Sequence, residues 1–467
     1  MAGPARSMER HRRPYASVLE IIGWTPLVRL NVVTDGARTP VYAKCEFMGP
    51  GGSVKDRIGV AMIEAAERAG TLRAGGTVVE ATSGNTGMAL AMAAALKGYR
   101  CVFTMPDKMS SEKVKLLRAF GAEVVITPTA VPPDHPDHYL QRARSIAAST
   151  PGAVMADQFY NPANPQAHYG TTGPEIWEQS EGRVTHFVGS AGTGGTITGV
   201  GRYLKERNPE VRVIGVDPEG SMIGPFFETG ERIEGHPYKV EGVGNDKIPG
   251  ALDLSVVDEY RTYTDGDAFR MSRRLTREEG LFTGGSSGLM VHGAVALAHE
   301  LDDSSAFVVT MLSDWGERYL SKMYDDDWMR ENGFLERPRR TTVFDLLAAK
   351  EPRVRELVTV APSTPVRVAL STITAHDIGQ LPVVLEGECV GSITETRLMT
   401  LVIDDPGLLD KLVESVMGPP FPVLEGHVDS EEIVHLMKRG NAACLVRHER
   451  RLVGIVTRYD VVRVLTA

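Results

Sequence analysis

The chain has 467 residues, of which 42% are hydrophobic and 24% are charged, and its formal net charge is -9. This length and composition are typical of a globular protein with about three domain-sized units. Acidic and basic residues are interspersed, which argues against a nucleic-acid surface, and no apolar run reaches the roughly 18 residues of a membrane helix. We therefore expect a cytoplasmic protein with neither nucleic acid nor membrane as a partner.

Short β-branched runs alternate with longer helical patterns through residue 325. The run at 77–84 precedes a helical pattern at 85–98, and the pairs 101–106 and 110–122, 123–128 and 138–149, and 186–192 and 193–207 follow, with further apolar runs at 211–218 and 305–314. This alternation predicts an α/β fold with a mostly parallel sheet that helices cover on both faces.

Four cysteines are spread along these elements and beyond them, and none forms a CxxC pair. We expect reduced, mostly buried thiols, no disulfide and no metal site. The cysteines are Cys45, Cys101, Cys389 and Cys444.

The stretch "GPGGSVKDRIG", residues 49–59, places Lys55 behind three glycines and ahead of a predicted helix. Its only neighbouring carboxylate is that of Asp56. A solvated lysine at a helix N-terminus is the commoner explanation of such a residue. The interpretation of Lys55 therefore depends on the other loops of the sheet.

Three further loops carry hydroxyl groups or glycines between a strand and a helix. "TSGNTG", 82–87, offers donors suited to a carboxylate, and "GSAGTGGT", 189–196, offers converging backbone N–H groups suited to a phosphate. "GGSSG", 284–288, adds Ser286 and Ser287 on a glycine turn. Helix capping or a tight turn explains each loop taken alone. No P-loop lysine and no GxGxxG accompany them, which argues against a nucleoside triphosphate or a dinucleotide.

The four loops together supply an amine, a phosphate cradle, donors for an amino acid's carboxylate and a partner for a ring nitrogen, which are the parts that a pyridoxal phosphate enzyme needs. "GGSVKDR", "TSGNTG", "GTGGT" and "GGSSG", in this order, resemble the fold-type II enzymes of the cysteine synthase and cystathionine β-synthase family. The resemblance implies a two-subdomain, parallel-sheet catalytic core at residues 1–335, with pyridoxal 5'-phosphate as its cofactor.

The resemblance also gives these residues roles. Lys55 would hold the cofactor as a Schiff base and later remove the substrate's α-proton, Asn85 would contact the ring hydroxyl, and Ser286 the ring nitrogen. The phosphate would lie on Gly192, Thr193, Gly194, Gly195 and Thr196. The substrate carboxylate would lie on Thr82, Ser83, Thr86 and Gln158.

The reaction that the resemblance implies is β-replacement on serine or an activated serine, with homocysteine as the favoured thiol and cystathionine as the product. Segments of the cysteine synthase branch, which uses sulfide, are also present, and Phe159 and Asn245 stand where animal and yeast cystathionine β-synthases usually carry tyrosine. A binding protein that kept the fold but lost catalysis is the alternative of another class. No haem is expected, because His11 has no cysteine near it.

After a basic, proline-containing linker at 336–341, the chain repeats itself: 381–394 aligns with 444–457 without gaps. The repeat resembles paired CBS domains, here at 342–400 and 415–467, where an adenosine ligand such as S-adenosylmethionine or a nucleotide would bind. Thr457 and Asp460 match the ribose-contacting motif, whereas the first copy has Thr394 followed by Arg397. A plain dimerisation domain is the alternative. We expect a homodimer or a higher homo-oligomer.

Overall fold

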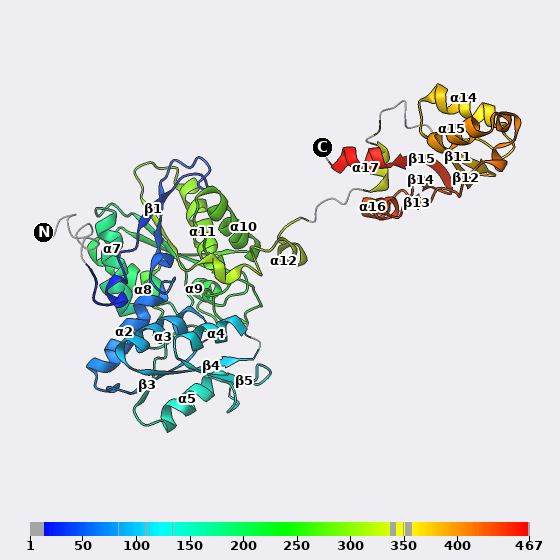
Figure 1. Ribbon diagram of the computed structural model, residues 1–467. Coiled ribbons are helices and arrows are strands. Elements are labelled where there is room, and N and C mark those ends of the chain that lie inside the picture. The colour runs from blue at the N-terminus through cyan, green and yellow to red at the C-terminus, as the bar shows by residue number, and fades with distance from the viewer. Residues whose placement is uncertain are drawn as a thin grey trace. The chain divides into compact units, whose positions relative to one another are not determined.

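The computed structural model describes residues 14–82, 84–107, 109, 111–132, 134–336, 342–348, 350 and 357–465. The chain divides into two compact units, Met1–Glu336 and Arg337–Ala467, here called the first unit and the second unit (Figure 1). Apart from Glu336, the linker predicted at 336–341 lies outside the described residues. The domain limits expected from the sequence stay predictions. Among the described residues, no helix has both the length and the apolar character needed to cross a membrane.

The larger sheet of the first unit has six strands in the order β1-β2-β10-β7-β8-β9. Neighbouring strands run parallel except β1, which pairs antiparallel with β2. Every residue of β10 is buried, as expected for a parallel strand with helices on both faces of its sheet. The strands are β1 (Leu27–Leu30), β2 (Val41–Cys45), β7 (His186–Gly189), β8 (Arg212–Pro218), β9 (Glu259–Tyr263) and β10 (Val308–Leu312).

The smaller sheet of the first unit has four parallel strands in the order β5-β4-β3-β6. Helices α2, α3 and α4 lie on one side of it and α5 lies on the other (Figure 1). Its strands are β3 (Thr77–Ala81), β4 (Arg100–Pro106), β5 (Glu123–Thr127) and β6 (Ala153–Met155). Both sheets therefore confirm the predicted α/β class.

The helices of the first unit cover these sheets. The α-helices are α2 (Lys55–Arg68), α3 (Asn85–Lys97), α4 (Ser111–Ala119), α5 (Tyr139–Ser149), α6 (Ala163–Gly170), α7 (Thr172–Gln179), α8 (Gly195–Arg207), α9 (Ile223–Thr229), α10 (Asp265–Glu278), α11 (Gly285–Leu301) and α12 (Asp326–Glu331). Short 3-10 helices are η1 (Val18–Ile21), η2 (Glu46–Met48), η3 (Leu254–Val256) and η4 (Gly316–Tyr319).

Apolar cores at both sheets hold the first unit together. Leu289, Val291 and Ala294 of α11 are fully buried against the larger sheet, since this helix is apolar on nearly all sides. Ile58, Leu90 and Phe103 anchor the core of the smaller sheet. Full burial of such a leucine, isoleucine or phenylalanine contributes about 1.5–3 kcal/mol relative to exposure. The cores fix the sheets, so the loops at the strand ends have a rigid base.

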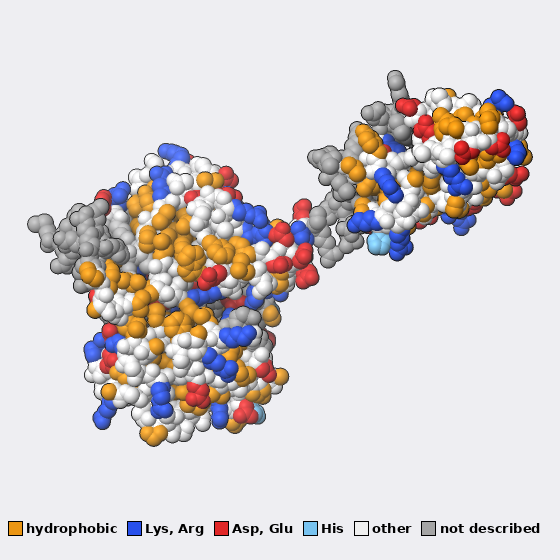
Figure 2. Space-filling model, in the orientation of Figure 1, with side chains coloured by type: hydrophobic (Ala, Val, Ile, Leu, Met, Phe, Trp, Pro, Cys, Tyr) orange, Lys and Arg blue, Asp and Glu red, His pale blue; other side chains and the backbone are white. Residues whose placement is uncertain are grey.

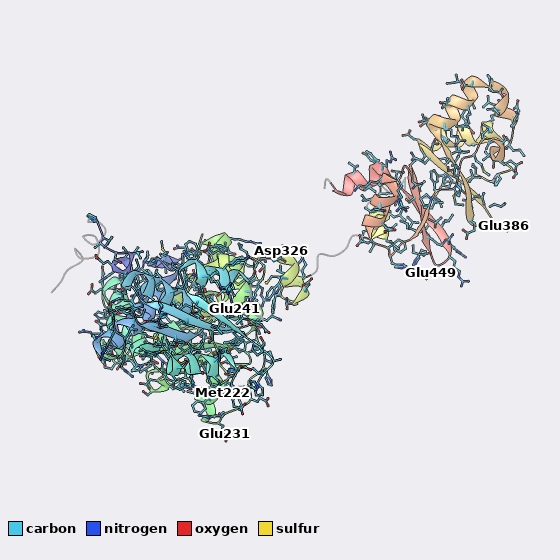
Figure 3. The ribbon with its side chains drawn as sticks, turned by 60° about the horizontal axis from the view of Figure 1, so that its bottom comes forward. Met222, Glu231, Glu241, Asp326, Glu386 and Glu449 are labelled. Carbon is cyan, nitrogen blue, oxygen red and sulfur yellow. The ribbon has the colours of Figure 1, made fainter. Side chains whose placement is uncertain are left out.

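The second unit contains two similar hairpins. Strands β11 (Gln380–Leu385) and β12 (Glu388–Thr394) form one, and β14 (Ala443–His448) and β15 (Arg451–Thr457) form the other, with β13 (Val423–Glu425) parallel to β14. Each hairpin has a register shift at the same aligned place, and Glu386 and Glu449 open turns of positive φ at the tips (Figure 3). The repeat predicted from the sequence is therefore present.

Helices flank both hairpins of the second unit. They are α13 (Val343–Ala348), α14 (Val366–His376), α15 (Glu395–Asp404), α16 (Ser430–Lys438) and α17 (Arg458–Leu465), with the 3-10 helices η6 (Pro406–Asp410) and η7 (Val413–Ser415). The order helix, strand, turn, strand and helix recurs in both copies. Each copy has its own apolar core.

Candidate active site

Lys55 is the first residue of α2 and its side chain is half-buried. The loop ahead of it is tied down: Val54 N donates to Ser313 O at 2.8 Å, and Ser53 forms a β-bridge with Asp314. Among the described residues, the Lys55 ammonium has no hydrogen-bond or ion-pair partner. Burial lowers the pKa of Lys55, although the charges of Asp314 and Glu46 oppose this. Lys55 is therefore not the solvated lysine that its turn alone would suggest, and its amine is available for chemistry.

A buried ion network holds the first turn of α2 in place. Arg57 Nε donates to Glu46 Oε2 at 2.7 Å, and Arg57 Nη1 donates to Glu175 Oε1 at 2.7 Å. Lys44 Nζ donates to Glu175 Oε2 at 2.7 Å, and the Lys44 side chain is fully buried. Burial opposes ionisation of Glu175, yet Arg57 and Lys44 bring its pKa to about 2. Removing one partner would leave a buried charge uncompensated.

The loop "TSGNTG" joins β3 to α3. Thr82 is buried, and Ser83 lies outside the described residues. The N-cap of α3 is Gly84, with no side-chain cap, so the capping alternative does not explain Asn85. Thr86 Oγ1 instead donates to Gln158 Oε1 at 2.6 Å. The loop thus brings two predicted carboxylate contacts together.

The predicted phosphate loop joins β7 to α8. Gly194 is the N-cap of α8 with φ +85°, and a side chain at Gly192 would put its Cβ 2.4 Å from Gly242 O. Both positions therefore require glycine. The N–H groups in the first turn of α8, which begins with Gly195 and Thr196, have no acceptor within the helix and suit an anion.

Two residues that the sequence analysis did not single out support this loop. Asn164 Nδ2 donates both to Gln158 O at 2.8 Å and to Thr193 Oγ1 at 2.9 Å, so it joins the carboxylate and phosphate loops. His168 Nε2 lies 3.2 Å from Thr196 Oγ1. Burial lowers the pKa of His168 well below its usual value, so the ring is neutral. The segment "NPANPQAH" that contains both residues was the available signal.

The turn "GGSSG" begins α11. Gly284 is the N-cap without a side-chain cap, which removes the capping explanation here too. Ser287 Oγ accepts from Ser313 N at 2.9 Å, whereas the Ser286 hydroxyl has no hydrogen-bond partner among the described residues. Ser286 is nevertheless buried. A hydroxyl that no protein group uses, on a residue that is otherwise buried, is available to a ligand.

Asp314, directly beyond the end of β10, is a further residue that the sequence analysis missed. Its Oδ2 accepts from Asn85 Nδ2 at 2.8 Å, and Gly284 N donates to its backbone oxygen at 3.1 Å. Asp314 therefore joins the Lys55 loop, Asn85 and the serine turn.

Pyridoxal phosphate matches this set of donors. In the part of the chain that the structure describes, a lysine amine and a serine hydroxyl have no partner, Asn85 offers an amide, and the glycines at a helix N-terminus leave room for an anion. Asp314 contacts the Lys55 loop, Asn85 and the serine turn, and Asn164 links the carboxylate loop to the phosphate loop. All four loops therefore lie at one site. The residues therefore suit the cofactor that the sequence predicts.

In the second unit, Thr457 N and Thr457 Oγ1 both donate to Asp460 Oδ2, at 2.7 and 2.8 Å. Lys350 Nζ lies 2.9 Å from the same oxygen. The first copy has no corresponding carboxylate, because Arg397 takes that place on α15. The two copies therefore differ at this position, and the ligand site at Thr457 and Asp460 stays a prediction.

Comparisons with known proteins support this description. Residues 18–314 match the family of pyridoxal-phosphate dependent enzymes, and residues 353–404 and 413–467 each match the CBS domain. Cystathionine beta-synthase of Oryctolagus cuniculus is 45% identical over 399 residues, covering 83% of this chain and 71% of the relative. That of Dictyostelium discoideum is 38% identical over 467 residues, covering 96% and 92%.

A solved structure of O-ureido-L-serine synthase is 40% identical, with a TM-score of 0.62, over 68% of this chain and 100% of that one. The chain belongs to the pyridoxal-phosphate dependent enzymes, as a β-replacement enzyme related to the cystathionine beta-synthases, with a C-terminal pair of CBS domains.

Proposed function

We propose that this enzyme condenses serine, or serine activated at its hydroxyl, with homocysteine to give cystathionine. The observation that carries the proposal is the identity of 38% with a cystathionine beta-synthase over 96% of this chain, CBS domains included. The arrangement of the four loops around Lys55 supports it. Pyridoxal phosphate, when bound, supplies the electron sink that lets an amino acid lose its α-proton and then its β-substituent.

Some residues of this site would bind the cofactor, and Lys55 would also transfer a proton. Lys55 would hold the cofactor and afterwards accept the α-proton, because its amine has no competing partner among the described residues and burial favours its neutral form. Asn85 contacts the ring hydroxyl and Ser286 the ring nitrogen. Because serine is neutral, it would leave that nitrogen unprotonated, and loss of the β-substituent would then be favoured over reprotonation.

The substrate carboxylate lies on the loop after β3. We assign it to Thr82, Ser83 and Thr86, with Gln158 completing the set through its contact with Thr86. The phosphate lies on the loop from Gly192 to Thr196, where the glycines admit it closely. These donors orient the substrate so that its α-proton faces the Lys55 amine.

The choice of thiol rests on two positions. Asn245 Nδ2 donates to Gly192 O at 3.1 Å, and the Lys247 ammonium lies 5.6 Å from the ring centre of Phe159. A tyrosine at each of the positions 159 and 245 would add a hydroxyl worth about 0.5–1.5 kcal/mol, or roughly two- to tenfold. Cysteine formation from sulfide is therefore the second candidate. By its name, the solved relative forms O-ureido-L-serine, a product other than cystathionine.

The test is a matrix of serine and O-acetylserine against homocysteine and sulfide. Cystathionine is expected as the favoured product, with Phe159→Tyr and Asn245→Tyr each improving kcat/KM for homocysteine by about two- to tenfold. A kcat/KM for sulfide that exceeds that for homocysteine by several orders of magnitude would contradict the proposal and indicate a cysteine synthase. A purified protein without yellow colour, or without a spectral response to either amino acid, would indicate the inactive binding protein.

For the second unit we propose a regulatory role. Asp460 would accept from both ribose hydroxyls of an adenosine ligand, such as S-adenosylmethionine or a nucleotide, with Thr457 beside it. The ion pair of Asp460 with Lys350 supports this role, because the carboxylate already accepts from a positively charged donor. Arg397 offers only donors, so the first copy lacks this site.

We also propose a homo-oligomer in the cytoplasm. Figure 2 shows hydrophobic side chains gathered on one face of the first unit, and Met48, Val32 and Leu320 of that unit are more than half exposed. Exposed apolar patches are typical of protein interfaces. Sedimentation of the purified chain measures the assembly directly, and a monomer at micromolar concentration would contradict it.

A further inference from the structure

Asp314 is a buried carboxylate that the reaction as proposed does not use. It is 1% exposed and has no ion-pair partner within hydrogen-bond distance among the described residues. Oδ2 accepts from Asn85 Nδ2 at 2.8 Å and from Tyr319 OH at 2.7 Å, whereas Oδ1 is buried without a partner. Burying an incompletely paired carboxylate costs free energy. Stability alone does not account for an aspartate at this position.

The surroundings of Asp314 are the loops that the cofactor needs. A Cβ at Gly284 would lie 2.2 Å from Asp314 Oδ1, so the carboxylate presses against the start of the serine turn. Ser53 bridges to Asp314 on the other side, two residues before Lys55. The charge of Asp314 acts on Lys55 directly, since it opposes the effect of burial there.

We propose that Asp314 is a positioning residue, which fixes the amide of Asn85 and supplies the negative charge that Lys55 faces. This inference rests on the proposed function. A carboxylate only accepts hydrogen bonds, so Asn85 must turn its nitrogen towards Asp314. That nitrogen keeps a second N–H for the ring hydroxyl. An asparagine at 314 could donate as readily as accept, and it would leave the amide of Asn85 unfixed.

Several other groups face this carboxylate and set its charge. Burial raises the pKa of Asp314, while hydrogen bonds from Asn85 and Tyr319 and the charges of Arg318 and Lys55 oppose the increase. The charge of Asp314 also contributes to raising the pKa of Tyr324. The residues on α3 and η4 thus favour the ionised form that the role requires.

The test uses the holoenzyme of Asp314→Asn. Because the negative charge that acts on Lys55 is lost, the pH midpoint of the cofactor's visible absorption band should fall by about one unit. The dissociation constant for pyridoxal phosphate, measured by rebinding after removal, should rise about tenfold. Asp258→Asn is the matched control, since Asp258 pairs with Lys205 and touches none of the four loops. It should change neither quantity.

A double-mutant cycle separates positioning from a merely structural role. If Asp314 acts through Asn85, then Asp314→Asn in an Asn85→Ala background should weaken cofactor rebinding by less than about twofold. Full additivity, or a wild-type midpoint in Asp314→Asn, would overturn the inference.

If Asp314→Asn does not fold, the variant Tyr319→Phe tests the same inference. Loss of the hydroxyl that donates to Asp314 should lower the midpoint, whereas Tyr324→Phe, whose hydroxyl donates to Thr283 O, should leave it unchanged. Equal midpoints in both variants and the wild type would overturn the inference. A wild-type chain that binds no pyridoxal phosphate would instead overturn the proposed function.

Discussion

Replacing Glu80 by glutamine should remove a pH dependence from the stability of the first unit. Glu80 lies on β3, two residues before Thr82, and is 1% exposed. Burial raises its pKa to about 8, with Asp157 adding to the increase and backbone N–H groups of Asp157, Ala81 and Gln158 opposing it. Glu80 is therefore a neutral acid at pH 7, and it helps to tether the segment that carries Gln158.

The magnitude follows from the two states of this carboxyl. Its pKa is about 8 when folded and 4.5 ordinarily, so the native state binds the proton more tightly. The stabilisation is complete below about pH 4.5 and is lost as the pH rises to about 8. At about 1.4 kcal/mol per pKa unit, the free energy of unfolding falls by up to about 5 kcal/mol across that window.

Calorimetry of the full chain, saturated with cofactor, measures this effect in the transition of the first unit. Between pH 5.5 and 8, the Glu80 contribution should lower the wild-type midpoint by about 4 °C, and Glu80→Gln should lack that decrease. The matched control is Glu67→Gln. Burial raises the pKa of Glu67, but hydrogen bonds from Lys97 and Tyr99 lower it by more, so the net pKa is lowered. Glu67 is therefore ionised throughout this pH range. Parallel pH profiles for wild type and Glu80→Gln would refute the reasoning.

Three further predictions concern the rest of the chain. A chain ending at Glu336 should remain coloured and active, because all four loops precede that residue, and loss of all cofactor binding would contradict this. Asp460→Ala should weaken an adenosine ligand about tenfold or more in calorimetry without changing basal turnover, and two equally strong sites per chain would disagree. Glu241 (Figure 3) pairs with Lys113 of α4 at 3.0 Å and also with Lys322, and all three side chains are partly exposed, so Glu241→Gln should cost about 1 kcal/mol or less in chemical unfolding. A loss above about 3 kcal/mol would show a stronger pair than its exposure implies.

The alternation of strands and helices was predictable because each run carries its own periodicity. The strands β3, β4, β5 and β7 and the helices after them begin and end close to the expected limits. The hairpins of the second unit were equally clear, since both copies repeat the same pattern. Local sequence decides such elements.

Strand order was not predictable, because it depends on pairing between distant segments. β2 lies between β1 and β10, and β10 lies far along the chain. The same limit applies to the site. Glycine-rich loops can be recognised in the sequence. The contacts of Asp314 with Asn85 and of Asn164 with Thr193 cannot, because they span 229 and 29 positions. The segment around Asn164 resembles a known family, but the pairing with Thr193, like that of Asp314 with Asn85, depends on the folded chain.

The central claim is that the four loops form one pyridoxal phosphate site with Lys55 at its centre. Borohydride reduction of the holoenzyme, followed by peptide mapping, tests it most directly. The account predicts a cofactor fixed to Lys55 in the wild type and a folded Lys55→Ala chain with none fixed, since no other lysine lies in a comparable glycine-rich turn. A cofactor fixed to another lysine, or still fixed in the variant, would contradict the account.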